Sequence, residues 1–471
     1  MCIRDSIYVV KPGDSLWTIS NYYNVSTAQM ISANGLQYPN SLLVGQSLII
    51  PVEDTVHVVK TGESLWQIAQ NYGISVQAIV DANRIINPQN IYPGLQLYIP
   101  ATRYQIKQGE TLEQIAERYG ISLERLMNTN NIQDSSLIYP GAVIVIPRQR
   151  PSIYVNGYIY DFTENSSNVV REVGDYLTYL SPFAYRIRED GSLETIDDSA
   201  LINAAYAENI VPMMAITNFT ATELGHNLAH VVLSNESIRE NLITNILDIM
   251  RNKGYLGVNI DFENVLPSDR ENYNTFLELT VERLHRENFF VSTALAPKTG
   301  PGQQGLLYEA HDYEAHGRIV DFVVLMTYEW GYRLGPPQAI SPLNRIKQVL
   351  DYAVTVIPRE KILFGFQLYA RDWIVPHLPG MEAETFSMQE AVARAVRYQV
   401  AIQFDPVSQT PFYNYIDEQG RQHQVWFEDA RSAQAKFDTV KDYRLRGISY
   451  WALGFPFPQN WTLLQDNFDI I

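Results

Sequence analysis

The chain has 471 residues, of which 46% are hydrophobic and only 18% charged, a composition that excludes a chain disordered throughout. The formal net charge is −17, from 35 basic and 52 acidic side chains. A protein that follows nucleic-acid phosphates needs the opposite sign, so nucleic acid is excluded as the main partner. No apolar run reaches the roughly 18 residues of a membrane helix, so we expect no membrane span.

The charge is divided unevenly along the chain. The first 150 residues carry 10 basic and 11 acidic side chains, whereas the remaining residues carry 25 and 41. This asymmetry predicts two functional units. The single cysteine, Cys2, excludes an intramolecular disulfide and a cysteine-based metal site. Residues 1–6 belong to no repeat and are left out of the fold prediction, and we recognise no signal peptide in the chain.

One segment occurs three times in the first 150 residues, and the copies begin at Ile7, Val56 and Arg103. Each copy starts with a β-like alternation and a glycine turn, and it ends in a short apolar strand closed by proline. Between them, apolar residues at helical spacing follow a residue suited to an N-cap, namely Ser15, Ser64 and Thr111. We therefore predict three βααβ modules with these bounds: 7–51, 56–100 and 103–147.

The three modules resemble LysM domains in order, length and turn chemistry. The resemblance implies binding to chains of N-acetylglucosamine-type sugars, in peptidoglycan or chitin. Three linked copies favour avidity on a polymer, and the alternative is that they are spacers. We assign Trp17 and Trp66 to the helix core rather than to sugar stacking. Glu113 stands at that position in the third copy, so we expect its packing or binding to differ.

From residue 152 to the end, apolar β-like runs alternate with helical stretches, the pattern of a parallel β/α sheet. Eight such strands in this length predict an α/β fold with a (β/α)8 TIM barrel. A doubly wound sheet is the alternative, but no Gly-rich phosphate loop follows the first strand. The predicted strands are Ile153–Tyr158, Tyr176–Phe183, Ile210–Ile216, Leu256–Phe262, Phe290–Ala296, Asp321–Met326, Ile362–Leu368 and Gly447–Ala452.

The fourth predicted strand and the residue after it, Leu256-Gly257-Val258-Asn259-Ile260-Asp261-Phe262-Glu263, contain two acids near the end. Side chains alternate along a strand, so Asn259, Asp261 and Glu263 share the face that points into the barrel. Two carboxylates buried in line are costly unless they are used or paired. They lie at the C-terminal end of the strand, where barrel enzymes place their chemistry, and chance exposure at a strand end is the alternative.

This strand resembles the glycoside hydrolase family 18 signature D-G-x-D-x-D-x-E. The chain keeps Gly257, Asp261 and Glu263 and departs from the signature at Leu256 and Asn259. Two further segments fit the family. Met326-Thr327-Tyr328-Glu329 stands where the family has M-x-Y-D, and Trp451 stands where it has the tryptophan of its last strand.

The resemblance implies a retaining, substrate-assisted glycosidase in which Glu263 is the general acid and the 2-acetamido carbonyl is the nucleophile. Asp261 would orient the acetamide and raise the pKa of Glu263, Tyr328 would bond the acetamide oxygen, and Trp451 would form an apolar floor. Because Asn259 replaces an acid, we expect a shifted pH profile more than a loss of activity.

Several other residues follow the ends of predicted strands and are candidates for substrate binding or for ordinary packing. We assign a substrate-binding role to Tyr158, Asn218, Asn259, Met326, Glu329, Trp330, Gln367 and Trp451, and we consider Tyr369, Tyr332 and Trp373 as well. The segment 398–429 contains two β-like runs around Asp417–Gly420, which predict a hairpin insertion that walls one side of the cleft.

We predict no metal and no cofactor. His226 and His230 are four residues apart, but the stretch lacks the glutamate of a zinc-protease motif, so we interpret both as ordinary helix residues.

LysM modules ahead of a family 18 barrel resemble the spore germination and cortex-lytic N-acetylglucosaminidases of bacilli. This implies a spore-associated or cell-wall-associated enzyme that acts on peptidoglycan. The third module departs from the usual two. The alternatives are a chitinase, an endo-N-acetylglucosaminidase on other glycans, or a non-catalytic coat protein that binds peptidoglycan or chitin. The sequence leaves the oligomeric state and the endo or exo action open.

Overall fold

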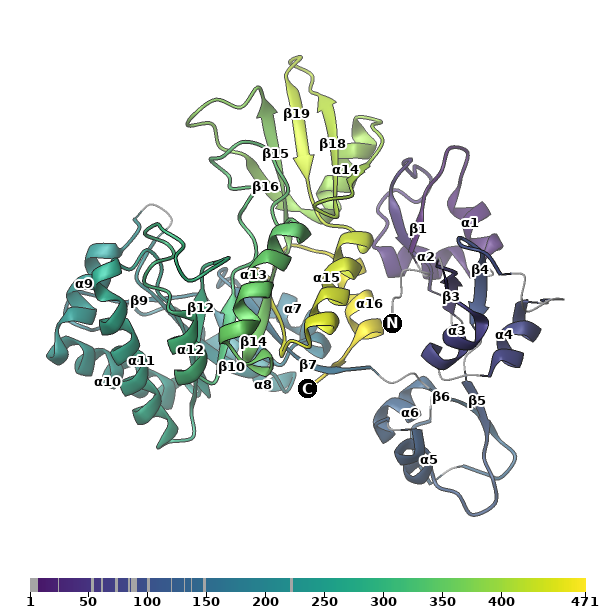
Figure 1. Cartoon of the computed structure of the whole chain (residues 1–471), viewed down its shortest axis with the longest axis horizontal. Helices are drawn as coiled ribbons and strands as arrows, with labels where there is room; N and C mark the ends of the chain where they lie inside the picture. Colours follow the sequence, from purple (N-terminus) through teal and green to yellow (C-terminus); the bar gives the residue numbers. More distant parts are fainter. Residues whose placement is uncertain are drawn as a thin grey trace. The chain divides into compact units, whose positions relative to one another are not determined.

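The computed structural model divides into two units, one with the small modules and one with the barrel, and each is described by itself. Figure 1 gives the chain's elements in order. The structure describes residues 7–23, 25–51, 55–60, 62–72, 75–83, 85, 91–99, 102–119, 121–130, 132–136, 138–146, 150–220 and 223–471. The leading residues 1–6 and the closing prolines of the second and third modules lie outside these ranges.

Each small module has the predicted order of strand, helix, helix, strand, and its two strands pair antiparallel. The first module comprises β1 (Ile7–Val9), α1 (Leu16–Tyr22), α2 (Thr27–Asn34) and β2 (Ser47–Ile49). The second comprises β3 (Thr55–Val58), α3 (Leu65–Tyr72), α4 (Val76–Asn83) and β4 (Gln96–Ile99). The third comprises β5 (Thr102–Gln105), α5 (Leu112–Tyr119), α6 (Leu123–Thr129) and β6 (Val143–Ile146).

The predicted N-caps are confirmed in all three modules. The hydroxyls of Ser15, Ser64 and Thr111 accept hydrogen bonds from the backbone N–H three residues on, at 3.1, 3.3 and 3.3 Å. A capping hydroxyl satisfies a helix N–H that has no partner within the helix. At the other end, the Asn34 amide bonds both the N–H and the C=O of Ile49, which ties the second helix to the last strand.

Trp17 and Trp66 are 67% and 64% exposed, so their assignment to the helix core is wrong. The reason is helical geometry: Leu16 and Ile19 fill the core of the first module, and a residue one position after Leu16 points about 100° away from it. Glu113 occupies the same exposed position in the third module and accepts a hydrogen bond from Ser135. The buried cores of the second and third modules match position by position, so this exchange changes only the surface.

The second unit is a closed parallel barrel, as predicted. Its eight strands follow the order β11-β12-β13-β14-β20-β7-β8-β10, and β10 pairs with β11 to close the ring. The strands are β7 (Ser152–Ile159), β8 (Tyr179–Pro182), β10 (Val211–Thr217), β11 (Gly257–Asp261), β12 (Phe290–Leu295), β13 (Phe322–Leu325), β14 (Ile362–Gln367) and β20 (Gly447–Trp451). Two short strands extend the sheet, namely β9 (Tyr185–Arg186) beside β10 and β21 (Asp469–Ile470) beside β7.

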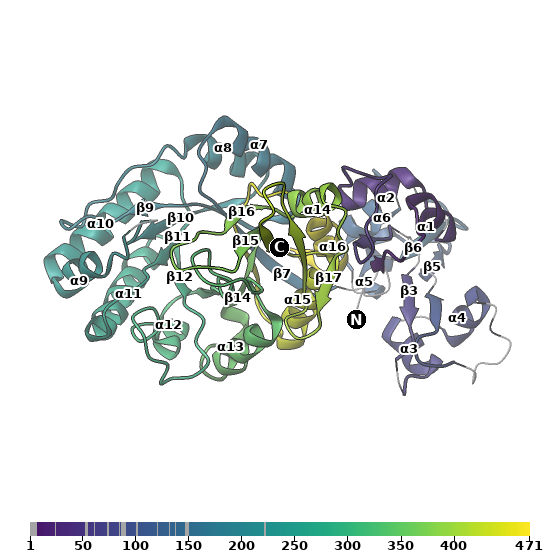
Figure 2. The same ribbon diagram turned by 90° about the horizontal axis from the view of Figure 1, so that it is seen from above.

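Helices form the outer layer around the barrel, as Figure 2 shows from above. They are α7 (Glu164–Val173), α8 (Ser199–Ala207), α9 (His226–Ser234), α10 (Glu236–Lys253), α11 (Arg270–His285), α12 (Tyr313–Ile319), α13 (Leu343–Val356), α15 (Ala430–Tyr443) and α16 (Pro458–Asn467). Three 3-10 turns complete the layer: Gly174–Tyr176, Pro267–Asp269 and Arg359–Lys361. None of the helices within the described ranges has the length and hydropathy needed to cross a membrane.

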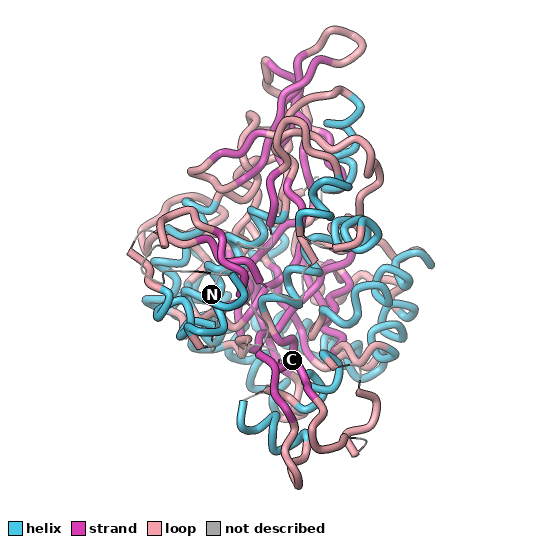
Figure 3. The backbone as a smooth tube through the Cα atoms, turned by 90° about the vertical axis from the view of Figure 1, so that its right-hand side faces the viewer, coloured by secondary structure: helices cyan, strands magenta, loops and turns pink. Residues whose placement is uncertain are grey.

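The predicted hairpin around Asp417–Gly420 exists, and it belongs to a larger insertion than the sequence indicated. The insertion follows β14 directly and forms a five-stranded antiparallel sheet of order β16-β15-β19-β18-β17, together with one helix. Its elements are β15 (Tyr369–Val375), β16 (Glu384–Ser387), α14 (Met388–Arg397), β17 (Gln403–Asp405), β18 (Thr410–Ile416) and β19 (Gln422–Trp426). These strands stand at one end of the barrel and extend away from it (Figure 3).

Candidate active site

The predicted alternation of side chains along β11 is present. Phe262, just after the strand, stacks on Tyr273 and Phe276 of the covering helix α11, with ring centroids 5.7 and 5.8 Å apart. Asn259 points the other way, into the barrel, where its Oδ1 accepts a hydrogen bond of 2.8 Å from the Tyr158 hydroxyl. The acidic residues that follow Asn259 on the same face therefore lie at the C-terminal mouth of the barrel.

Asn259 connects two other strands of the barrel. It accepts from Tyr158 of β7, and its Nδ2 donates to Ser292 Oγ of β12 at 2.9 Å. An ionised carboxylate at this position could only accept hydrogen bonds, so the Ser292 hydroxyl would have to turn and donate to it. The amide therefore suits a buried site where the family signature has an acid.

Asp261 is a buried carboxyl whose Oδ1 has no hydrogen-bond partner in the part of the chain that the structure describes. Burial raises its pKa well above the ordinary value, and the neighbouring Glu263 carboxylate adds to the effect. Buried polar atoms are almost always hydrogen-bonded, so an oxygen without a partner at the mouth of a barrel is available to a ligand.

Glu263 is partly exposed, and burial together with the charge of Glu329 raises its pKa to about 7. At neutral pH a large share of this carboxyl therefore holds a proton that it can donate. The two carboxyls of Asp261 and Glu263 interact, and the charge of Glu329 is a further contribution that the sequence did not indicate.

Glu329 is held by the first residues of the insertion. Its two carboxylate oxygens accept hydrogen bonds of 2.9 Å from the Arg371 guanidinium, and the Tyr369 hydroxyl also donates to it. A bidentate guanidinium pair fixes a carboxylate in one orientation. Arg371 is absent from the sequence-based candidates, although its spacing of two from Tyr369 within an alternating run placed both on one face.

We expect Glu329→Gln to shift the alkaline limb of the kcat/KM–pH profile to lower pH by about 0.5–1 unit. The negative charge of Glu329 raises the pKa of Glu263, so its removal lowers that pKa and leaves less acid protonated at pH 7. The control is Glu382→Gln, which removes an exposed acid paired with Arg333. An alkaline limb that stays in place or moves to higher pH would contradict the assignment.

Asn218 is fully buried and holds the backbone of Glu263. Its Nδ2 donates to the Glu263 carbonyl at 2.8 Å, and its Oδ1 accepts from the Glu263 N–H at 2.9 Å. A further bond of 3.2 Å reaches the Gly225 carbonyl. The amide is thus engaged with main chain, so Asn218 is a positioning residue for Glu263 rather than part of a sugar-contacting surface.

His311 performs a similar task on the other side of the strand and was missed by the sequence analysis. The backbone N–H of Ala296 donates to its Nδ1, so its Nε2 carries the proton and donates to the Phe262 carbonyl at 2.9 Å. Burial lowers the pKa of His311 to about 4, which keeps the ring neutral. A side chain that bonds only main chain leaves no pattern in the sequence.

Trp451 lies among aromatic rings at the end of β20. Its indole is partly exposed, and its ring centroid lies 4.8 Å from Phe183, 5.5 Å from Tyr158 and 6.1 Å from Tyr160. These rings support the indole, and its exposed part is available to an apolar sugar surface. Of these neighbours, Tyr158 is 3% exposed, so it supports the indole and Asn259 more than it contacts solvent.

Tyr328 is brought to the two acids from the end of β13. Burial raises the pKa of its hydroxyl well above the ordinary value, and the nearby Asp261 and Glu263 add to the shift, so the hydroxyl keeps its proton. The ring lies against Gly365 of β14, where a Cβ would stand 2.9 Å from Tyr328 Cε1 and 2.3 Å from the Leu325 carbonyl oxygen. Glycine at 365 therefore makes room for the tyrosine ring.

The remaining candidates occupy varied positions. Gln367 is fully buried and donates from Nε2 to Glu428 at 2.7 Å, while its Oε1 is without a partner among the described residues. Met326 is partly buried and packs on the barrel core. Trp373 is buried in the insertion and donates to the Gly335 carbonyl, so it does not stack on a ligand. Tyr332 is 45% exposed.

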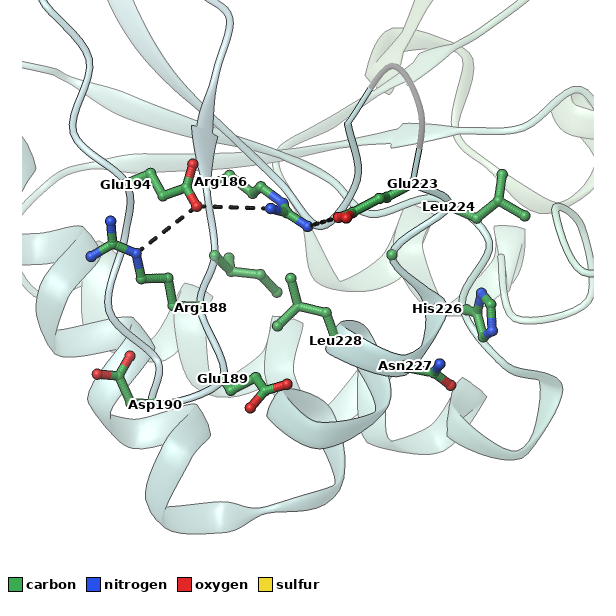
Figure 4. Close-up of a pocket in the computed structure, with 12 residues that line it drawn as sticks. Arg186, Arg188, Glu189, Asp190, Glu194, Glu223, Leu224, His226, Asn227 and Leu228 are labelled. Carbon is green, nitrogen blue, oxygen red and sulfur yellow. Dashed lines mark hydrogen bonds and ion pairs between the residues drawn. The ribbon is translucent and has the colours of Figure 1, made fainter.

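Two cavities lined by described residues lie beside loops that follow strands of the barrel. One, of about 690 Å³, lies beside β9 and α9, and its two guanidiniums are paired with acids: Arg186 with Glu194 and Glu223, and Arg188 with Glu194 (Figure 4). The other, of about 520 Å³, lies beyond β12 and β13 and contains Trp330. Neither lining includes Asp261, Glu263 or Tyr328, so both cavities lie apart from the two acids.

Of the predicted helix histidines, His226 lines the first cavity and His230 bonds Asp269 at 2.7 Å. Within the described ranges, no group of three or more His, Cys, Asp or Glu side chains is arranged to hold a metal ion.

Comparison with known proteins agrees with this geometry. Residues 184–455 match the model of glycosyl hydrolases family 18, and residues 8–51, 57–100 and 104–147 match the LysM domain. The chain is 44% identical over 470 residues to the cortical fragment-lytic enzyme of Bacillus subtilis, covering 99% of this chain and 98% of that protein.

The chain is similar to solved crystal structures, two of which are spore cortex-lytic enzymes. The spore cortex-lytic enzyme SleL of Bacillus megaterium matches with a TM-score of 0.80 and 37% identity, over 99% of this chain and 98% of that one. The SleL of Bacillus cereus matches with a TM-score of 0.68 and 39% identity, over 89% and 99%. The chain is therefore a glycosidase that belongs to glycosyl hydrolases family 18, and it carries three LysM domains ahead of its catalytic barrel.

Proposed function

We propose that this enzyme cleaves N-acetylglucosaminyl linkages in peptidoglycan of the spore cortex, or in its fragments, by a retaining, substrate-assisted mechanism. The observation that carries the mechanism is the pairing of a proton-holding Glu263 with an Asp261 oxygen that lacks a partner. One group supplies the proton for bond cleavage, and the other is open to the acetamide N–H.

In the first step, Glu263 donates its proton to the glycosidic oxygen, and the bond from that oxygen to C1 breaks. The carbonyl oxygen of the 2-acetamido group attacks C1 and forms a cyclic oxazolinium ion. Asp261 accepts from the acetamide N–H and stabilises the positive charge, and the Tyr328 hydroxyl donates to the acetamide oxygen. In the second step, Glu263 takes a proton from water, whose oxygen attacks C1 from the leaving-group side. The bond from C1 to the acetamide oxygen breaks, which restores the acetamido group and the original configuration at C1.

The substrate is supported by similarity along the whole chain. The Bacillus subtilis relative, at 44% identity and nearly full coverage of both proteins, is a cortical fragment-lytic enzyme, and the two structural neighbours are spore cortex-lytic enzymes. LysM domains and a family 18 barrel both suit peptidoglycan or chitin-type glycans. We therefore place the enzyme at the spore or the cell wall, where that polymer is found.

The direct test is digestion of purified spore cortex, with the new reducing end identified by mass spectrometry. We expect N-acetylglucosamine at that end, because its free 2-acetamido group can assist the cleavage of its own bond, whereas a muramic lactam has no free acetamido group. A muramic-type sugar at the new reducing end would overturn the proposed bond. Cleavage of chitin but not of cortex would favour the chitinase alternative.

The exposed tryptophans of the first two LysM modules indicate which side chains contact the polymer. We expect Trp17→Ala with Trp66→Ala to weaken binding to insoluble peptidoglycan by about tenfold, because each variant removes an exposed indole that can stack on a sugar ring. Pull-down with insoluble peptidoglycan measures the binding. The control is Glu113→Ala, at the matching position of the third module. Unchanged binding of the double variant would contradict a stacking role.

A further inference from the structure

The cavity of about 520 Å³ beside Trp330 has an unusual charge for this barrel. Residues 151–471 carry 41 acidic and 25 basic side chains, yet the residues that line the cavity include one cation, Arg345, and no acid. The lining comprises Pro297, Thr299, Gly300, Gly302, Gln303, Tyr308, Trp330, Arg345 and Gln348. A positive cavity in an acidic domain is a feature that a negatively charged ligand group would use.

Arg345 itself is available to a ligand. It is exposed, and in the described part of the chain its guanidinium makes neither an ion pair nor a hydrogen bond. The guanidiniums of the other cavity behave differently, since Arg186 and Arg188 both contact acids (Figure 4). The buried Arg371 is likewise paired, with Glu329.

The position of Arg345 in its helix is also unfavourable without an anion. It lies in the first turn of α13, which has no acidic residue in that turn and no side-chain cap at Pro342. The positive end of the helix dipole disfavours a cation there. The negative charge of a bound carboxylate would compensate the positive charge of Arg345 and the positive end of the helix dipole.

Residues that line the cavity lie close in the sequence to the catalytic residues or to the strands beside them. Trp330 follows Glu329 and stands two residues after Tyr328, and Pro297 follows β12, the strand that pairs with β11. Loops after barrel strands and the starts of the following helices lie on the catalytic face. A sugar next to the one being cleaved, on the β12–β13 side of Glu263, would therefore reach this cavity.

We infer that this cavity is a subsite for a carboxylate-bearing sugar of the glycan, with Trp330 and Tyr308 contacting the sugar and Arg345 pairing with its carboxylate. The inference rests on the proposed function and narrows it, because peptidoglycan carries carboxylates and chitin does not. The carboxylate has two sources, the lactyl group of the muramic sugar and the peptide attached to it.

The test compares three soluble glycan fragments of equal length: one with free lactyl carboxylates and no peptide, one with the acidic peptide, and one with all carboxylates converted to amides. We expect wild-type enzyme to prefer a carboxylate fragment over the amide fragment by about three- to tenfold in kcat/KM. Arg345→Ala should abolish the preference, and higher salt should reduce it. Whichever carboxylate fragment shows the preference identifies the source.

Lys347→Ala is the matched control, because it removes a cation from an exposed position of the same helix that does not line the cavity. It should retain the preference. The subsite would be overturned if Arg345→Ala still preferred the carboxylate fragment over the amide fragment. It would also be overturned if Lys347→Ala lost this preference to the same extent as Arg345→Ala.

A second readout separates this inference from the proposed function. The affinities of Glu263→Gln and of Glu263→Gln with Arg345→Ala for the same fragments are measured by calorimetry, without turnover. If wild-type enzyme cleaves no fragment but Glu263→Gln binds the carboxylate forms more tightly and the double variant does not, the proposed function fails and the subsite stands. If wild-type enzyme cleaves the fragments and both variants bind the amide and carboxylate forms equally, the subsite fails alone.

Discussion

Glu263→Gln is expected to lower kcat on cortex fragments by about 10²–10⁴-fold, the range that a positioned acid–base group contributes. The amide has nearly the shape of the protonated carboxyl, but it cannot transfer a proton to the glycosidic oxygen. Initial rates of reducing-end release measure the loss, and calorimetry measures fragment binding, which should persist. Retention of more than a few per cent of wild-type turnover would contradict the assignment.

The same substitution should stabilise the barrel at alkaline pH. The pKa of Glu263 is raised from 4.5 in the unfolded chain to about 7, so its contribution to stability is complete below pH 4.5 and is lost as pH rises through 7. Glutamine does not ionise and suffers no such loss.

The free energy of unfolding of the Gln variant should therefore equal that of wild type at pH 4 and exceed it by about 1–3 kcal/mol at pH 8. Calorimetric melting of the barrel at both pH values measures it. Glu314→Gln is the control, because Glu314 is an exposed acid on α12. A Gln variant that is less stable than wild type at pH 8 would show that the surroundings of Glu263 do not destabilise its ionised carboxylate.

Asp261→Asn is expected to lower kcat by about 10²–10³-fold with a smaller change in KM. The amide keeps an oxygen near the acetamide N–H but cannot carry the negative charge that stabilises the oxazolinium ion, and a preorganised group of this kind contributes an effect of that size. The loss should appear in kcat because the positive charge develops only during the reaction.

The matched control is Asn259→Asp, which replaces an amide by an acid two residues before Asp261 on the same face of the strand. It restores the acid of the family signature but removes the Nδ2 donor to Ser292. We expect a loss of less than about tenfold, together with a shifted pH profile. Comparable losses in the two variants would mean that Asp261 acts through packing of the strand rather than through its charge.

Much of the site could be predicted because the relevant patterns are local. Alternation along Gly257–Glu263 placed Asp261 and Glu263 on one face, since the period of a strand is two residues wherever the strand lies. The three modules were found by their repeat. The exposed Trp17 was also within reach of local reasoning, because it directly follows the core residue Leu16.

The sequence alone does not show where the insertion begins, because its first strand follows a barrel strand almost without interruption. The strand β15 begins at Tyr369, two residues after β14 ends at Gln367, and no glycine or proline separates the two runs. The sequence therefore shows one apolar stretch where the chain leaves the barrel and starts a second sheet, and only the hairpin around Asp417–Gly420 had a visible turn.

The amino-acid sequence by itself determined the fold class, the repeats and the two acids at the end of β11, because each depends on spacing between near neighbours. Only the tertiary structure decided what acts on those acids. The Asn218 amide holds a backbone 45 residues away, Arg371 reaches Glu329 from the inserted sheet, and burial together with the charge of Glu329 raises the pKa of Glu263. Charges and buried hydrogen bonds act through space, so their partners are settled by the packing of distant segments and not by their order in the chain.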